Sequence, residues 1–236
     1  MEAQQVVLSK NEVAEEMLID DLKIVQDTRL YRFTSDSVML SRFAKAKKGD
    51  VIADFCAGCG IVAFHFYALN KTKYKTSPKF VLFEMQDELL GLAKKTAKLN
   101  NFTNFDFQLG KLQEISATYR EAFSLVLCNP PYEKANTGFE NNDYKKAVCR
   151  KEITLNLEEI AKSAEFVLKF SGRLCLLHRA DRLAEVCYTL KQYRLEVKKI
   201  QFVKGKTDEK PYLVMVEAVK GGKPSTQILP TVCNEG

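Results

Sequence analysis

Short apolar runs alternate with amphipathic stretches along most of the chain, and this alternation restricts the possible folds more than any other feature. Buried strands of a parallel sheet have continuous apolar sequences, whereas helices place apolar residues three or four positions apart. Strands are expected at 51–55, 80–83, 105–108, 124–128, 173–177, 195–202 and 212–218, and helices at 61–69, 87–100, 155–170 and 183–193. The alternation predicts a doubly wound α/β fold with helices on both faces of a mostly parallel seven-stranded sheet, whose last two strands form an antiparallel hairpin.

Length and composition indicate one domain. The 236 residues, 46% of them hydrophobic, contain no repeat or low-complexity linker, so residues 1–236 are read as a single domain with a short extension before about position 45. There is no signal-peptide pattern and no apolar run of the ~20 residues that a membrane span needs. Seven cysteines, an odd number, indicate reduced thiols. We therefore expect a soluble protein of the cytoplasm.

The turn after the first strand has the composition of a nucleotide-binding loop. Gly58 and Gly60 allow a tight turn against a ligand at a helix N-terminus, but the same residues also satisfy the dinucleotide G-x-G-x-x-G/A pattern. Asp54 favours S-adenosylmethionine, because a carboxylate there pairs with the cationic aminopropyl end of this cofactor and repels a pyrophosphate. A turn or capping role for Asp54 is the alternative.

Two further positions extend the expected cofactor site. Glu84 ends the second strand, where a carboxylate can accept both ribose hydroxyls, although dinucleotide sites use the same chemistry. Met85 beside it is a candidate for packing on the adenine, with an ordinary core methionine as the alternative.

Cys56 and Cys59 form a C-x-x-C pair within the glycine loop. A zinc site needs about four ligands, and the chain has no second close cysteine pair and two histidines. We therefore expect no metal and assign the two thiols, Cys56 in particular, to the lining of the loop.

The tetrapeptide Asn129-Pro130-Pro131-Tyr132 after the fourth strand is the most specific signal in the chain. The prolines stiffen the backbone, and the Asn129 side-chain carbonyl with the Pro130 main-chain carbonyl can accept both hydrogens of a planar amine. Tyr132 offers a face on which a flipped-out base or a planar amide stacks. The pattern predicts methylation of an exocyclic amine without a metal or a covalent intermediate; a plain strand-ending turn is the alternative.

These motifs resemble the class I (Rossmann-like) amino-methyltransferases with an N-P-P-Y sequence. A longer resemblance, carried by residues 24–40, 150–152, 176–185 and 216–224, is to the bacterial tRNA adenine-N6 methyltransferases that modify the adenosine beside the anticodon of a valine tRNA. It implies that Phe33 and Asp36 border the cofactor pocket, while an N-cap role for Asp36 is equally open. The family usually has Gly-Asp after the third strand, where this chain has Gly110-Lys111, and a lysine cannot accept a hydrogen bond from the cofactor adenine.

The net charge of +6 is compatible with a polyanionic partner but does not establish one. The candidate phosphate contacts are Lys145, Lys146, Arg150, Arg179, Arg182 and the basic stretch 191–210, with residues 133–144 as a mobile loop over the target. Solvated faces and surface ion pairs explain these residues nearly as well.

Four other functions compete with methylation of adenine N6 in tRNA. A glutamine-N5 methyltransferase of release factors shares the N-P-P-Y sequence but resembles proteins with an additional N-terminal helical domain, for which about fifty residues before the loop are too few. A DNA adenine methyltransferase would usually carry a recognition domain. Asp54 disfavours a nicotinamide-dependent oxidoreductase, and the intact tetrapeptide disfavours an inactive RNA-binding module. The oligomeric state stays open.

Overall fold

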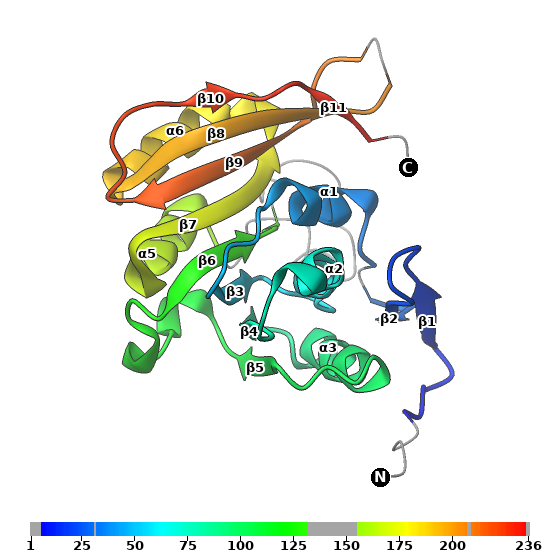
Figure 1. Cartoon of the computed structure of the whole chain (residues 1–236). Helices are drawn as coiled ribbons and strands as arrows, with labels where there is room; N and C mark the ends of the chain where they lie inside the picture. Colours follow the sequence, from blue (N-terminus) through cyan, green and yellow to red (C-terminus); the bar gives the residue numbers. More distant parts are fainter. Residues whose placement is uncertain (1–5, 31, 132–154, 207–208, 235–236) are drawn as a thin grey trace.

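The computed structural model describes residues 6–30, 32–131, 155–206 and 209–234, and within these ranges the main sheet has nine strands in the order β10-β8-β9-β7-β6-β3-β4-β5, with β11 also paired to β8 (Figure 1). The strands are β3 (Val51–Phe55), β4 (Lys79–Glu84), β5 (Phe105–Leu109), β6 (Phe123–Cys128), β7 (Leu168–Arg179), β8 (Leu195–Lys204), β9 (Leu213–Lys220), β10 (Gln227–Ile228) and β11 (Val232–Cys233). The sheet therefore has nine strands rather than seven, because the two-residue strands β10 and β11 are too short to show a sequence pattern.

The sheet is parallel from β7 to β5, and beyond β7 only the pairings of β9 are antiparallel, because β10 and β11 pair in parallel with β8. β3 pairs in parallel with both β4 and β6, and β6 pairs in parallel with β7. β9 runs antiparallel to β7 and to β8. Since β4 and β6 flank β3, the order of the sheet reverses at β3, which is where ligands bind in open α/β sheets.

Helices on the two faces enclose two separate hydrophobic cores. One core lies under α1 (Ser35–Phe43), α2 (Ile61–Asn70) and α3 (Asp87–Leu99), and the other under α5 (Leu157–Val167) and α6 (Leu183–Gln192). Successive residues of β3 alternate between them, with Ile52 in the first core and Ala53 and Phe55 in the second. This alternation along a fully buried strand explains the continuous apolar sequence.

The region expected as one helix over 155–170 divides into two elements. α5 ends at Val167 and β7 begins at Leu168, which pairs with Phe123 before the register shifts to Arg173 opposite Leu125. Ser171 has a φ of 62°, so Ser171-Gly172 lies in an irregularity of the strand instead of ending the helix. The apolar spacing of α5 continues to Leu168, the first residue of the strand, so the pattern alone does not mark the end of the helix.

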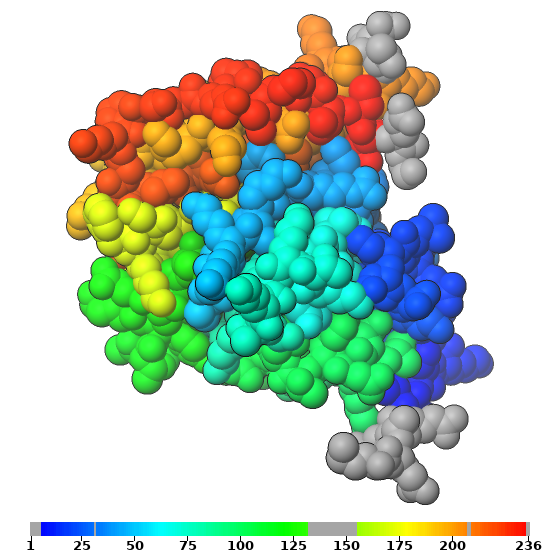
Figure 2. Space-filling view, viewed as in Figure 1, coloured from blue at the N-terminus to red at the C-terminus, as the bar shows by residue number. Residues whose placement is uncertain are grey.

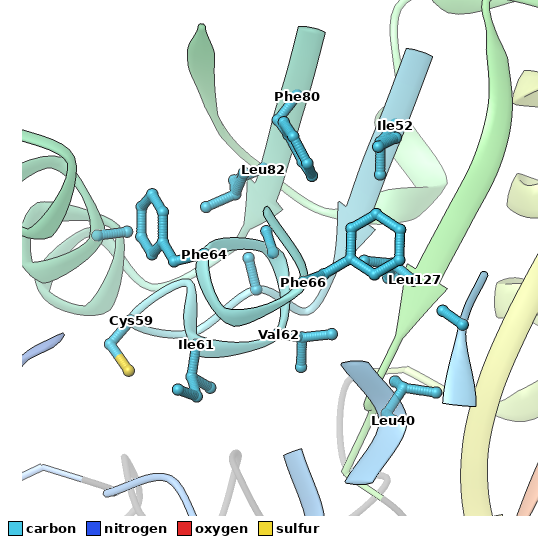
Figure 3. Close-up of a cluster of buried hydrophobic side chains, with 14 of the residues drawn as sticks. Leu40, Ile52, Cys59, Ile61, Val62, Phe64, Phe66, Phe80, Leu82 and Leu127 are labelled. Atoms are coloured by element: carbon cyan, nitrogen blue, oxygen red, sulfur yellow. The ribbon is translucent and has the colours of Figure 1, made fainter. Parts of the chain in front are cut away.

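α2 is apolar on every side and packs between the sheet and α1. Figure 3 shows Phe64, Phe66 and Val62 of this helix against Phe80 and Leu82 of β4 and Leu40 of α1. The Phe64 ring also contacts Phe105 of β5, with centroids 4.7 Å apart. No helix in the described part of the chain is long and apolar enough to cross a membrane.

The N-terminal extension forms a small sheet of its own. β1 (Glu12–Glu16) pairs antiparallel with β2 (Lys23–Asp27), and this hairpin lies beside α3 (Figure 2). The backbone N–H of Val25 donates to Thr96 Oγ1 at 2.9 Å, and Lys95 Nζ pairs with Glu12 at 2.6 Å. The extension is thus attached to the domain through α3.

Candidate active site

A pocket lies at the carboxyl ends of the parallel strands, where the strand order reverses. Four loops form its walls, one after each of β3, β4, β5 and β6, and the segment around the start of α1 closes one side. Its lining includes Phe33, Ser37, Cys56, Ala57, Gly58, Cys59, Glu84, Met85, Gln86, Gly110, Lys111, Leu112, Gln113, Asn129, Pro131 and Leu155.

Most of the residues expected at a cofactor site line this pocket. Phe33, Cys56, Gly58, Glu84, Met85, Gly110 and Lys111 are among its walls, whereas Asp36, Asp54 and Gly60 are not.

The glycine loop turns through three residues in the left-handed region. The φ angles are 56° at Cys56, 57° at Gly58 and 85° at Gly60, and Gly60 caps the N-terminus of α2. A non-glycine residue such as Cys56 adopts this conformation at a cost of about 1–3 kcal/mol, which the surrounding structure must offset. The loop therefore presents its backbone to the pocket at the start of α2.

Glu84 connects the loop after β3 to the loop after β4. Its Oε2 accepts a hydrogen bond from the Gly58 N–H at 2.9 Å, and its Oε1 accepts from the Met85 and Gln86 N–H groups, both at 2.9 Å. Burial raises the pKa of this carboxyl, and the three backbone bonds oppose that shift. Glu84 is thus held at the floor of the pocket in a fixed orientation.

Asp54 lies behind the pocket wall. Its side chain is on the face of β3 that α2 covers, where Oδ2 accepts from the Ala63 N–H at 3.1 Å, and the residue is 1% exposed. Oδ1 is buried without a hydrogen-bond partner among the described residues. Burial raises the pKa of Asp54 to about 8, with a further contribution from Glu84.

The raised pKa of Asp54 makes stability depend on pH. Between about pH 4, where the unfolded carboxyl ionises, and about pH 8, the folded state holds a proton that the unfolded state has lost, so the free energy of unfolding falls as pH rises. Asp54→Asn is expected to flatten this decline by up to about 1.4 kcal/mol per pH unit. Urea unfolding of the wild-type protein and of Asp54→Asn at pH 5, 6, 7 and 8 measures the free energy of unfolding of each protein. Parallel pH dependences would show that Asp54 is ionised in the fold.

The two cysteines of the loop point into different surroundings. Cys59 packs in the core under α2 (Figure 3), and burial raises the pKa of its thiol to about 12. The pKa of Cys56 is raised well above its usual value, first by a hydrogen bond with the Cys128 thiol and then by burial. Both thiols are therefore protonated at neutral pH. No group of three or more metal-ligating side chains occurs in the part of the chain that the structure describes.

Asn129 carries an unused hydrogen-bond acceptor at the pocket. It follows β6 directly, and its Nδ2 donates to Ser37 Oγ of α1 at 2.9 Å. Its Oδ1 is buried and has no partner among the described residues. Pro131 lines the pocket and Pro130 is buried beside it, while Tyr132 lies outside the described residues.

Asp36 does not reach the pocket, which corrects the expectation from the family resemblance. It lies in the first turn of α1, one position after the start of the helix, and Thr34 occupies the N-cap instead. Asp36 Oδ1 accepts from the Tyr212 hydroxyl at 2.8 Å and from Asn234 Nδ2 at 3.0 Å. Neighbouring helix positions point in different directions, so Ser37 faces the pocket while Asp36 ties α1 to the C-terminal segment.

The two arginines expected to hold RNA both form ion pairs with nearby carboxylates. Arg179, half-exposed, binds Asp181 at 2.6 Å. Arg182 is 8% exposed and binds Glu185 at 2.6 Å, so its guanidinium is largely withdrawn from solvent and does not suit a phosphate contact. Lys145, Lys146, Arg150 and the expected loop 133–144 lie outside the described residues.

The sequence did not indicate Ser37, Gln86 or Gln113 as parts of the site. Ser37 reaches the pocket through α1, a nine-residue helix that the apolar pattern did not show. No local signal distinguishes a serine that contacts a residue 92 positions away in the chain.

Residues 46–222 match the family model of the methyltransferase domain, which is three quarters of the chain. The chain belongs to this methyltransferase family. Its cofactor is S-adenosylmethionine, in agreement with the pocket at the reversal of the sheet. Membership of this family argues against two functions that the sequence left open, a nicotinamide-dependent oxidoreductase and an inactive RNA-binding module.

Two curated relatives share the name tRNA1(Val) (adenine(37)-N6)-methyltransferase. The protein of Shewanella sediminis is 22% identical over 184 residues, which is 76% of this chain and 72% of that protein. The protein of Porphyromonas gingivalis is 29% identical over 97 residues, covering 41% of this chain and only 37% of its own length.

Solved structures share the fold of this methyltransferase. A protein described as a predicted O-methyltransferase from Agrobacterium tumefaciens superposes with a TM-score of 0.64 at 18% identity, over 84% of this chain and 86% of that one. Trm5b from Pyrococcus abyssi superposes with a TM-score of 0.60 at 12% identity, over 89% of this chain and 56% of that one. At these identities the likeness concerns the class I α/β fold with its mainly parallel sheet.

Proposed function

We propose that this methyltransferase transfers the methyl group of S-adenosylmethionine to N6 of an adenine in tRNA, with adenosine 37 of a valine tRNA as the target. The observation that carries the proposal is the position of Asn129, directly after β6, with its Oδ1 buried at the pocket and without a partner among the residues that the structure describes. A buried acceptor without a partner is unfavourable by about 1–3 kcal/mol, and a donor supplied by a substrate removes that penalty.

The pocket has the groups needed to hold the cofactor. Glu84 Oε1 and Oε2 already accept three backbone hydrogen bonds, and a carboxylate has about four lone-pair directions, so capacity remains for a ribose hydroxyl. Met85, Phe33 and Leu112 supply apolar contacts for a purine. Asp54 acts from behind the loop by holding the Ala63 N–H at the first turn of α2.

The catalytic task of the chain is to orient the amine. The bound cofactor supplies an electrophilic methyl group on a sulfonium, which is already a good leaving group. Asn129 Oδ1 and the Pro130 carbonyl accept the two amine hydrogens, which draws the nitrogen out of conjugation with the base and exposes its lone pair. Proline at 130 and 131 limits the backbone conformations that would move these acceptors. Tyr132 then stacks on the base.

The relatives support tRNA as the substrate class, because both carry the name of a tRNA adenine-N6 methyltransferase. Methylation of glutamine N5 in a protein such as a release factor remains the second candidate. A planar amide presents the same two hydrogens to Asn129, so the geometry of this residue alone serves both substrates.

A labelling experiment with parallel acceptors tests the proposal. Enzyme and tritiated S-adenosylmethionine are incubated with a valine tRNA transcript that has adenosine at position 37, with the same transcript carrying guanosine there, and with a release factor. We expect label in the first acceptor alone, recovered as N6-methyladenosine after digestion. Label in the release factor would move the substrate to the glutamine class. Equal labelling of both transcripts would exclude position 37, and no label in any acceptor would contradict the proposed reaction.

A further inference from the structure

We infer that Ser37 is a positioning residue that holds the Asn129 amide with its oxygen available to the target amine. The inference rests on the proposed function of Asn129. It assigns a task to a residue of α1 that lies 92 positions away from Asn129 in the sequence. Ser37 Oγ accepts the hydrogen bond from Asn129 Nδ2 at 2.9 Å, and Ser37 is 4% exposed. Both residues line the same pocket.

The Asn129 side chain needs such a restraint because its two ends have opposite roles. The oxygen accepts hydrogen bonds and the NH₂ group donates them. An amine that must be methylated also presents donors, so only the oxygen end is useful. Since the terminal torsion of an asparagine is broad, the amide plane turns easily unless one end is bound. The bond to Ser37 occupies the nitrogen end, and within the described part of the chain Oδ1 has no hydrogen-bond partner.

The position of Ser37 is itself well supported. The Ser37 N–H donates to the Thr34 carbonyl at 3.1 Å in the first turn of α1. The next residue back, Asp36, is bound by Tyr212 and Asn234, and Asn234 Nδ2 also donates to Ser35 Oγ at 2.8 Å. The start of α1 is therefore attached to the C-terminal segment on one side and to the catalytic asparagine on the other.

α1 provides a matched control one turn further along. Ser41 is also a buried serine of this helix, but its Oγ donates to the Val38 carbonyl at 2.7 Å and lies 2.7 Å from His65 Nδ1 of α2. Ser41 is absent from the pocket lining. Removing either hydroxyl thus disturbs the same helix, whereas only Ser37 contacts Asn129.

The first test compares the two serine variants with the acceptor that the wild-type enzyme methylates. Ser37→Ala is expected to lower kcat about tenfold, the equivalent of one hydrogen bond of about 1.4 kcal/mol, with the Kd for S-adenosylmethionine unchanged by calorimetry. Ser41→Ala is expected to lower the melting temperature and to leave kcat unchanged. If Ser37→Ala and Ser41→Ala lowered kcat equally, Ser37 would have only a packing role and the inference would be wrong.

A double-mutant cycle identifies the residue through which Ser37 acts. In an Asn129→Ala background no amide remains to be oriented, so Ser37→Ala should cause no further loss of kcat. Losses that multiply would show that Ser37 acts independently of Asn129, through the cofactor or the fold, and would overturn the inference.

A nuclear magnetic resonance measurement separates this inference from the proposed function, because it requires no acceptor. The side-chain NH₂ signals of Asn129 are identified as those missing in Asn129→Asp. We expect their exchange with water to quicken in Ser37→Ala and to stay unchanged in Ser41→Ala. If wild-type enzyme methylates no amine while this difference is present, the proposed function fails and the contact stands. Unchanged exchange in Ser37→Ala would contradict the contact itself.

Discussion

Replacing Asn129 with alanine is expected to lower kcat by about 10²–10³-fold, with the affinity for S-adenosylmethionine retained. In the proposed mechanism the variant lacks the acceptor that orients the amine, and the carbonyl of Pro130 alone would leave one amine hydrogen without a partner. The proposed cofactor contacts after β3 and β4 should be untouched, because the hydrogen bonds of Glu84 do not involve Asn129. Single-turnover kinetics and calorimetry measure the two quantities separately.

Asn129→Asp is the informative control for this prediction. Aspartate keeps an oxygen at the position of Oδ1, and Ser37 can donate its hydroxyl hydrogen to the other carboxylate oxygen. We expect this variant to retain more activity than Asn129→Ala. Full activity in Asn129→Ala would mean that another group orients the amine.

Gly60→Ala is expected to destabilise the protein by about 2–5 kcal/mol. The left-handed φ of 85° is unfavourable for alanine by about 1–2 kcal/mol, and the added Cβ would overlap the Phe64 ring. Phe64 cannot easily yield, because its ring packs against both Phe102 and Phe105 in the core under α2. Overpacking of this kind adds about 1–3 kcal/mol.

Gly58→Ala is the matched control in the same loop. Gly58 has a positive φ of 57° as well, but a Cβ there meets no atom of the described residues within 4 Å. We expect a loss of only about 1–2 kcal/mol, from the backbone alone. Thermal unfolding without cofactor compares Gly58→Ala with Gly60→Ala. We expect Gly60→Ala to lower Tm by roughly 4–20 °C relative to wild type. Equal losses would show that the Phe64 ring moves aside.

The sequence was most informative where a property is local. The sequence pattern located all seven long strands of the main sheet, by continuous apolar runs for buried strands such as β3 and β6 and by alternating apolar residues for β8. It was less reliable at the boundary of α5 and β7, where both elements are apolar and only the pairing of Leu168 with Phe123 decides between them. β10 and β11, each two residues long, follow from pairing with β8 and from nothing in their own composition.

The residues of the candidate site show the same contrast between local properties and long-range contacts. Gly58, Glu84 and Asn129 line the pocket, as expected for residues at or within three positions of a strand end, because the carboxyl ends of parallel strands meet at one edge of a sheet. The sequence left the roles of Asp36 and Arg182 open, because these depend on the direction of a side chain, toward Tyr212 for Asp36 and toward Glu185 for Arg182.

By itself the sequence determined the class of fold, the glycine loop at the start of α2 and the place of an asparagine directly after β6, because strand periodicity, glycine and proline act over a few neighbouring residues. Only the tertiary structure decided that Asp54 lies behind the pocket, that Asp36 is turned away, and that Ser37 binds Asn129. These outcomes depend on contacts between residues distant in the chain, and such contacts form only when the helices settle on the sheet.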